Sequence, residues 1–202
     1  FLMEMNNRLC KGDRIIQGYL DAKNPYDTWV AGTFAIAFWV IDHISHLAKT
    51  NIGLSAVLGG TGMCITTDVL ERYGWRATCL TEDMEFTMKS LAEGIKTTWA
   101  HDAIVYDEKP LTFMQSWRQR KRWAQGQFDV AHRYIPKMLK EGIKRRDIRI
   151  LDGCLYLLQP HFLMISTFFI IISYIQSAFP PFYTNIYNII PSQLMTAIML
   201  GQ

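Results

Sequence analysis

The last 50 residues of the chain, from Gly153 to Gln202, contain no Asp, Glu, Lys or Arg. The stretch before them has the opposite bias. Between Thr112 and Arg149 there are 11 Lys and Arg residues against three acidic ones, a net charge of +8, although the whole chain carries only +3. A basic block followed directly by an uncharged apolar block is typical of a membrane boundary.

Within the uncharged block, residues 154–178 form an apolar run long enough to cross the roughly 30 Å hydrocarbon core of a bilayer. Gln159, Pro160 and His161 interrupt its first third, which indicates a kink, a polar lining, or a span that begins nearer Phe162. A buried core helix is the alternative, but the length of the run and its lack of charge argue against it. We therefore expect a membrane protein.

The charge pattern also orients the chain. Because basic residues precede the span, the positive-inside rule places residues 1–149 in the cytoplasm of a multi-pass protein of the cell membrane. The transmembrane region is expected to cover residues 150–202, with a second span starting near Ile189. Four cysteines without a C-x-x-C pair fit a reducing compartment. No signal peptide is visible and Phe1 is not a native start, so we expect a piece that lacks material at both ends.

Before residue 110, short strands alternate with helices in the hydrophobic pattern, which predicts an α/β domain. The apolar stretch from Trp29 to Leu47 is short for a span, so we expect a buried or interfacial helix there. Thr112 and Gln115 form a capping-box pattern at the start of a long helix. Strands are predicted at residues 14–19, just before the turn at 59–62, and at 77–80, 96–99 and 103–106; further helices are predicted at 1–10, from 66 onwards and at 81–93.

Thr81-Glu82-Asp83 is expected at a turn from a strand into a helix, with Thr81 as the helix cap. Two carboxylates in a first helical turn are favoured by the free amides and the dipole there, which is the ordinary reason for such a sequence. The same environment keeps a carboxylate ionised at neutral pH, as a base that deprotonates a sugar hydroxyl must be. Loops at the carboxyl ends of strands are also where α/β sheets place ligand sites.

Gly59-Gly60-Thr61-Gly62 is a candidate phosphate-binding turn, but it has neither the G-x-G-x-x-G nor the G-x-x-x-x-G-K pattern. A structural turn that allows a close backbone approach is favoured. His43 and His46 lie three residues apart on an apolar helix, and without a further His or Cys nearby we do not expect them to bind a metal ion.

The run from Arg118 to Arg122 is basic at four of its five positions and is flanked by Trp117 and Trp123. Gln119, Arg122 and Trp123 stand at i, i+3 and i+4, so on a helix an amide, a guanidinium and an indole share one face. An anionic, partly sugar-like ligand such as a nucleotide-diphosphate sugar needs those three groups. A solvated basic helix with two core Trp residues is the alternative.

The order of these features resembles the membrane-embedded processive glycosyltransferases of family 2, the group of the cellulose, chitin, hyaluronan and poly-N-acetylglucosamine synthases. A G-T-G turn is followed by T-E-D and then by Q-R-K-R-W, whose Gln119 lies 36 residues after Asp83, ahead of the basic stretch and the span. Residues 118–126 look most like the poly-N-acetylglucosamine type. The resemblance implies the C-terminal half of a GT-A-type catalytic domain at 1–110, a Q-x-x-R-W helix with basic interfacial helices at 111–149, and the transmembrane region.

The resemblance implies a role for each matching residue. Asp83 matches the general base of an inverting transfer from a nucleotide-diphosphate sugar onto a growing polysaccharide. Gln119, Arg122 and Trp123 match the motif that closes over the donor and its diphosphate. The residues implied on the acceptor side are Gly60, Thr61, Gly62, Glu82 and Trp123.

A divalent cation, Mg or Mn, is also implied, but the family's metal-binding D-x-D lies upstream of Phe1. We therefore expect no metal ligands in this chain and no activity from it alone. The expected partners are a nucleotide-diphosphate sugar, a growing glycan or lipid acceptor, and membrane lipid, without nucleic acid. Two alternatives stay open: a non-processive membrane transferase that adds one sugar to a lipid, and a membrane-anchored basic module that holds anionic lipid or nucleic acid. The second leaves T-E-D unexplained.

Overall fold

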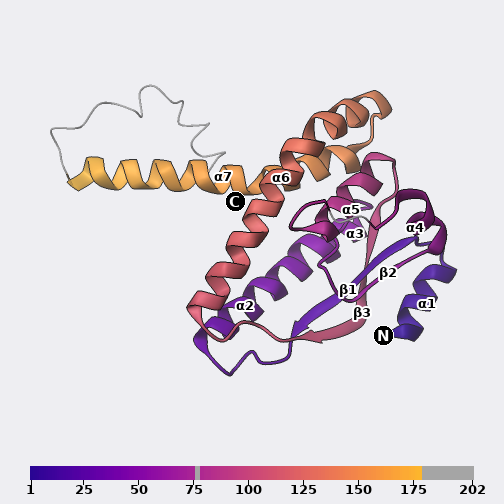
Figure 1. Ribbon diagram of the computed structural model, residues 1–202, viewed down its shortest axis with the longest axis horizontal. Helices are drawn as coiled ribbons and strands as arrows, with labels where there is room; N and C mark the ends of the chain where they lie inside the picture. Colours follow the sequence, from indigo (N-terminus) through magenta and orange to yellow (C-terminus); the bar gives the residue numbers. More distant parts are fainter. Residues whose placement is uncertain (76–77, 179–202) are drawn as a thin grey trace. The chain divides into compact units, whose positions relative to one another are not determined.

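The computed structural model describes residues 1–75 and 78–178. The chain forms two compact units, residues 1–157 and 158–202, and the second is described as far as residue 178 (Figure 1). In chain order the elements are α1 (Leu2–Cys10), β1 (Ile15–Ala22), α2 (Trp29–Val40), the π-helix η1 (Ile41–Leu47), α3 (Ala48–Asn51), β2 (Met63–Ile65), α4 (Thr67–Tyr73), α5 (Glu82–Ala92), β3 (Thr97–Asp107), α6 (Phe113–Arg145) and α7 (Ile148–Ala178).

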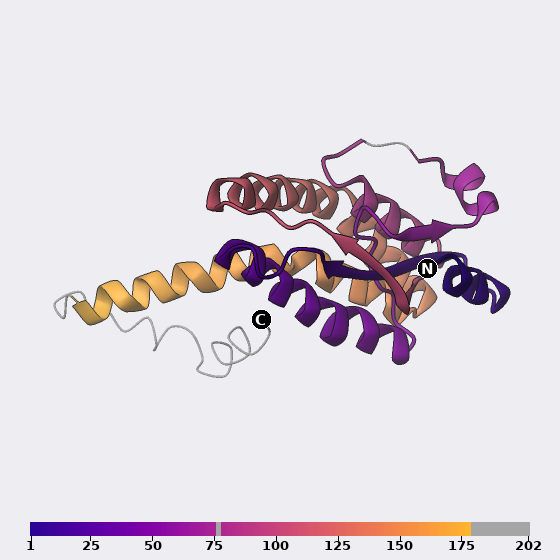
Figure 2. The same ribbon diagram turned by 90° about the horizontal axis from the view of Figure 1, so that it is seen from below.

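The first unit is built on a three-stranded sheet with the order β2-β1-β3. β1 pairs antiparallel with β2 and parallel with β3, and every residue from Ile15 to Leu20 in this central strand is buried. A parallel pair needs a long crossover connection, and here the chain between the two strands supplies it with the helices α2 to α5. In Figure 2 the strands run between α2 and the first half of α6. The predicted α/β class is confirmed.

The two strands predicted at 96–99 and 103–106 are one strand, β3. Its pairing with β1 shifts register between Gly18 and Tyr19, so the strand accommodates the irregular residues that separate the two predicted segments. β2 was missed because three residues are too few to show an alternating pattern.

Two other predicted strands are wrong. The segment before the glycine turn makes only a single bridge, from Ala56 to Thr97, and residues 57–58 join no ladder. Residues 78–80 are irregular, and residue 77 lies outside the described part of the chain. T-E-D therefore follows an irregular segment instead of a strand, although the helix that it opens, α5, is present as predicted.

The apolar stretch from Trp29 to Leu47 is helical, as expected, but its second part is the π-helix η1. The Thr28 hydroxyl caps its start by accepting a hydrogen bond from Ala31 N (3.1 Å). One face of α2 is buried and includes Phe34, whereas Ile36 on the other face is 57% exposed. The helix is therefore only half buried.

α6 begins with the predicted capping box: the Thr112 hydroxyl accepts from Gln115 N, and the Gln115 side chain accepts from Thr112 N. The helix continues for 33 residues through Pro136 and ends at Arg145, and the cap residue Arg146 has a left-handed φ of 53°. One helix therefore occupies the region in which we expected a Q-x-x-R-W helix followed by separate basic helices.

α7 runs without a break through Gln159, Pro160 and His161. Up to residue 157 it belongs to the first unit, where Ile150 and Leu157 are fully buried in a core cluster with residues of α5 and α6. After residue 157 most of its large apolar side chains are exposed. Two helical stretches, Trp29–Asn51 and Ile148–Gln176, are long and apolar enough to cross a membrane. The span predicted from Ile189 lies outside the described residues.

Candidate active site

Asp83 is the second residue of α5, and its Oδ1 accepts a hydrogen bond from Met84 N (2.7 Å). Burial raises the pKa of Asp83 above its ordinary value; the Met84 amide opposes this, the Glu82 carboxylate adds to it, and the Arg122 guanidinium lowers it. We expected the helix terminus to favour the charged form, but burial outweighs that effect. A raised pKa makes a carboxylate a better proton acceptor, which suits a general base.

The glycine turn lies against this carboxyl group. A β-carbon added at Gly60 would be 3.3 Å from Asp83 Oδ2, and the φ of +79° at this residue is one that side chains with a β-carbon rarely adopt. Thr61 is exposed and Gly62 is half-buried. The turn and Asp83, separated by about twenty residues of sequence, are therefore neighbours in space, as two sides of one site must be.

Gln17 holds the turn in place, and sequence reasoning missed it. Its side chain is 1% exposed; Nε2 donates to Thr61 O (2.9 Å) and to Gly18 O (3.0 Å), while Oε1 accepts from Gly59 N (2.9 Å). A buried amide that satisfies backbone groups on both of its atoms fixes the conformation of the segment that it binds. The available signal was a glutamine inside the apolar strand Arg14 to Tyr19.

α6 approaches the head of α5 at a glycine. A β-carbon added at Gly126 would lie 2.4 Å from Thr81 Oγ1 and 2.5 Å from Thr81 Cγ2, too close for any other residue without movement. Thr81 occupies the cap position of α5, but its side chain makes no capping hydrogen bond, contrary to our expectation. Because Gly126 lies one helical turn after Arg122 and Trp123, this contact brings both of them beside T-E-D.

Trp123 packs on α2. Its ring centroid lies 6.1 Å from that of Phe34 and 6.2 Å from that of Phe38. The Arg120 guanidinium carbon is 4.3 Å from the Phe34 centroid, and Lys109 Nζ is 3.6 Å from the Phe38 centroid. The indole of Trp123 is half-buried, so part of it remains accessible.

The other members of the predicted donor motif are more open. Gln119 is half-buried and Arg122 is exposed, and both share a face of α6 with Trp123. Trp117 is 57% exposed, so the alternative of a helix with two core Trp residues does not hold for it. Glu82, predicted on the acceptor side, is half-buried next to Asp83. The fold thus brings the Asp83 carboxylate against the glycine turn and within the influence of the Arg122 charge, while the Trp123 indole packs on α2.

Within residues 1–75 and 78–178, no group of three or more His, Cys, Asp or Glu residues could hold a metal ion. Glu82 and Asp83 are the carboxylates of the site, and two adjacent acids are too few to supply a cation with its usual set of oxygen ligands. The described residues therefore do not by themselves fit the divalent cation that the resemblance implies.

The first unit thus combines a mixed sheet, an acidic helix head that lies against a glycine turn, and a basic, tryptophan-bearing helix. Comparison with known families gives the class: the family model "Glycosyl transferase family group 2" matches residues 2–200. The chain belongs to this family of glycosyltransferases, as the sequence had predicted.

Two curated relatives are similar over about half of the chain. The probable glycosyltransferase YdaM of Bacillus subtilis (strain 168) is 31% identical over 109 residues, which cover 54% of this chain and 25% of YdaM. An N-acetylglucosaminyltransferase of Rhizobium meliloti (strain 1021) is 27% identical over 124 residues, which cover 56% of this chain and 29% of that protein. The chain thus matches between a quarter and a third of the length of these relatives.

Proposed function

We propose that the protein to which this chain belongs is an inverting glycosyltransferase that moves a sugar from a nucleotide-diphosphate sugar onto a growing polysaccharide at the membrane. The observation that carries the proposal is the position of Asp83. Its half-buried carboxyl group lies against the Gly60 turn, and the Arg122 charge is close enough to lower its pKa. A proton acceptor, Asp83, and a positive charge, that of Arg122, therefore lie at the same site, as the transfer of a sugar from a diphosphate requires.

The proposed chemistry needs one base. Asp83 takes the proton of the acceptor hydroxyl while that oxygen forms a bond to the anomeric carbon of the donor. The bond between that carbon and the diphosphate oxygen breaks, and its electron pair leaves with the diphosphate. Attack from the side opposite the leaving group inverts the anomeric configuration.

The remaining residues bind and orient. The guanidinium of Arg122 offsets charge on the departing diphosphate, and Gln119 donates hydrogen bonds from the same helix face. We assign the accessible part of the Trp123 indole to the acceptor sugar, together with the turn of Gly60, Thr61 and Gly62 and with Glu82. A bound Mg or Mn ion would add further positive charge at the diphosphate, and we assign no step to it because the part of the chain that the structure describes shows no ligand set for it.

The membrane is the proposed location because of α7. In its most apolar stretch only 11% of the helix is buried, which is typical of a segment that lipid covers. The basic α6 before it supports a cytoplasmic position for residues 1–149 in a multi-pass protein. An N-acetylglucosaminyl donor is proposed from the similarity to the Rhizobium meliloti enzyme, together with the wording of residues 118–126.

Product analysis tests the proposal. Membranes containing the full-length protein are incubated with nucleotide-diphosphate N-acetylglucosamine that carries a radioactive sugar, with or without Mg or Mn. We expect a long polymer whose linkage is inverted relative to the donor. A glycolipid carrying a single sugar would contradict processive synthesis. Salt-dependent binding of nucleic acid without affinity for any nucleotide sugar would contradict the enzyme itself.

A further inference from the structure

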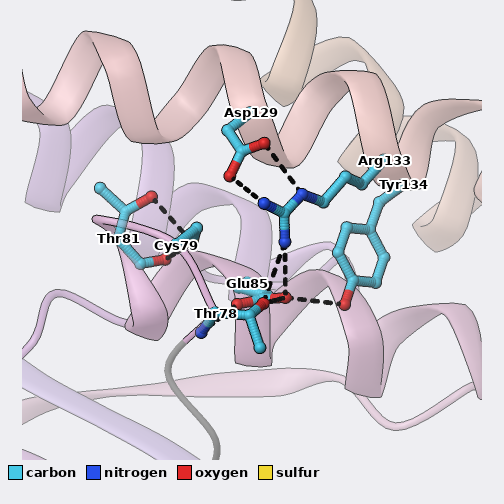
Figure 3. A network of polar contacts seen from close by, with 7 residues as sticks. All are labelled: Thr78, Cys79, Thr81, Glu85, Asp129, Arg133 and Tyr134. Atoms are coloured by element: carbon cyan, nitrogen blue, oxygen red, sulfur yellow. Dashed lines mark hydrogen bonds and ion pairs between the residues drawn. The ribbon is translucent and has the colours of Figure 1, made fainter.

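A buried carboxylate lies two residues beyond Asp83, where α5 meets α6 (Figure 3). Glu85 is 7% exposed, and charged side chains are almost never so deeply buried unless they are paired. Its position on the helix turns it away from the glycine turn and toward α6. The side chains around it belong to none of the roles proposed above.

Glu85 is held from two segments. Thr78, just before T-E-D, donates to it through its hydroxyl and through its backbone N (3.3 Å). From α6, the Tyr134 hydroxyl donates to Glu85 Oε1 (3.1 Å), and Arg133 Nη1 lies 4.0 Å from the same oxygen. Glu85 is buried and Tyr134 half-buried, whereas Thr78 and Arg133 are exposed. A buried carboxylate that is hydrogen-bonded from two chain segments ties those segments together.

Arg133 joins the pieces of this network. Its Nη1 donates to Thr78 Oγ1 (3.0 Å), and its Nε donates to Asp129 Oδ1 (2.8 Å) one helical turn earlier. The Asp129 carboxylate also pairs with Nη2 (2.7 Å), so the planar guanidinium is held in one orientation. The dashed lines in Figure 3 follow this path from α6 to the segment that leads into T-E-D.

The protonation states suit these contacts. Burial alone would raise the pKa of Glu85, but hydrogen bonds, above all from Thr78, outweigh it and hold the pKa below its ordinary value. Burial and the neighbouring Glu85 raise the pKa of Tyr134 to about 12, so this phenol keeps the proton that it donates. At neutral pH the network therefore contains a carboxylate, a guanidinium and a hydroxyl donor.

Besides the apolar packing between α5 and α6, the network is the second of two contacts that α6 makes near the head of α5. The first is Gly126 on Thr81; Arg133 follows two helical turns later, and Arg122 lies one turn before the glycine. One contact would leave a helix free to rotate or slide about it, whereas two contacts on the head of α5 prevent both. The distance from Asp83 to Arg122 and Trp123 depends on that alignment.

We propose that Thr78, Glu85, Arg133 and Tyr134 are positioning residues that hold α6 in register with the head of α5 and so set the separation between Asp83 and the donor-binding face of α6. The inference rests on the proposed function, because it assigns these residues to the alignment of that site. None of the four touches a substrate in this assignment.

The same two helices provide a matched control. Lys137 Nζ and Glu93 Oε1 form an ion pair of 3.1 Å between α6 and α5, farther from T-E-D and on the exposed side. Exposed ion pairs contribute roughly 0–1 kcal/mol to stability. Lys137→Ala therefore removes a contact between the helices without removing the one that aligns the site.

The test compares Tyr134→Phe and Thr78→Val with Thr78→Ser and Lys137→Ala in the full-length protein. Phe keeps the ring and loses the hydroxyl, and Val keeps the shape of Thr but cannot donate, whereas Ser restores the hydroxyl. We expect Tyr134→Phe and Thr78→Val to lower kcat by about 3- to 100-fold, since misplacement of reacting groups by about 1 Å can cost a factor of 100. In these two variants KM for the donor should stay close to the wild-type value. In Thr78→Ser and Lys137→Ala, kcat should also stay close to the wild-type value.

A distance measurement separates this inference from the proposed function. Spin labels on bioorthogonal amino acids at positions 80 and 121, both exposed, report the separation of the T-E-D segment and α6. The distance distribution should broaden or shift in Tyr134→Phe and Thr78→Val, and not in Lys137→Ala. Unchanged distances, or variants that lose thermal stability but keep kcat, would overturn the inference. If the wild-type protein had no transfer activity but the variants showed the expected distance changes, only the proposed function would be overturned.

Discussion

Asp83 illustrates how several groups set the chemistry of one residue. Burial against the glycine turn and the adjacent Glu82 both favour its neutral form, whereas the Met84 amide and the Arg122 charge favour the anion. The sequence indicated the amides of the helix terminus, but not the close approach of the Gly60 turn, which the fold brings to this carboxyl group. The proton affinity of this carboxyl group is therefore a property of three chain segments.

The pH dependence of transfer should report this balance. A base acts when it is deprotonated, so kcat/KM should fall about tenfold for each pH unit below the pKa of Asp83. Because this pKa is raised, the fall should begin at a higher pH than for an aspartate with an ordinary pKa. Arg122→Gln removes a charge that lowers this pKa and should move the acid limb to higher pH, even though the rate falls. Glu82→Gln removes a charge that raises it and should move the limb to lower pH. Shifts of both variants in the same direction would contradict the assignment of Asp83 as the base.

At the scale of elements, α2 is the least expected part of the site. We expected a buried or interfacial helix, and its Phe34 and Phe38 support the indole of Trp123. α2 is almost wholly apolar, so it has no polar face that would have indicated a functional helix from the sequence. Its contribution depends on a contact with a residue of α6 about ninety positions later in the sequence, and hydrophobic periodicity cannot predict such a distant contact.

Phe38→Leu tests this support. The substitution keeps an apolar side chain but removes an aromatic contact, and such contacts contribute about 0.5–1.5 kcal/mol. We expect KM for the glycan acceptor to rise roughly 2- to 10-fold, with a smaller effect on donor binding, in steady-state assays of the full-length protein. Ile36→Ala, on the exposed face of the same helix, is the control and should leave both constants unchanged. An equal effect of the two substitutions would show that Trp123 does not depend on Phe38.

Local motifs predicted more of the site than of the sheet. The capping box of α6 and the helix start at T-E-D depend on neighbouring residues, and both are confirmed. The strands predicted near residues 57 and 78 are wrong because apolar character alone does not create a pairing partner. Gln17 and Gly126 act through contacts more than 40 residues away, so their partners could not be predicted from the sequence, although a glutamine inside an apolar strand was a signal for Gln17.

At the scale of the whole molecule, α7 changes character along its length. Ile150 and Leu157 are buried in the core of the first unit, whereas Phe168 in the second unit is 60% exposed. A helix that is a core element at one end and an apolar surface at the other can couple a catalytic unit to a membrane. The sequence indicated the apolar length but did not show where burial by protein ends.

Membrane insertion of the second part of α7 should respond to charge near its centre. Phe168→Lys should reduce insertion strongly, because a lysine at the middle of a span costs about 2.5–3.5 kcal/mol. The inserted fraction is measured in microsomes with a glycosylation acceptor site placed after residue 178 of the full-length protein. Ile143→Lys, at a similarly exposed position of α6, is the matched control and should insert normally. If Phe168→Lys left the inserted fraction unchanged, this segment would not lie in the hydrocarbon core of the membrane.

The most direct measurement is sugar transfer by the full-length protein carrying Asp83→Asn, beside binding of the nucleotide-diphosphate sugar to the same preparation. Asn has the shape of Asp but cannot take the hydroxyl proton, so transfer should fall roughly 100- to 10,000-fold while the affinity for the donor stays close to wild type. Polymer formation at the wild-type rate would contradict the assignment of Asp83 as the catalytic base of this glycosyltransferase.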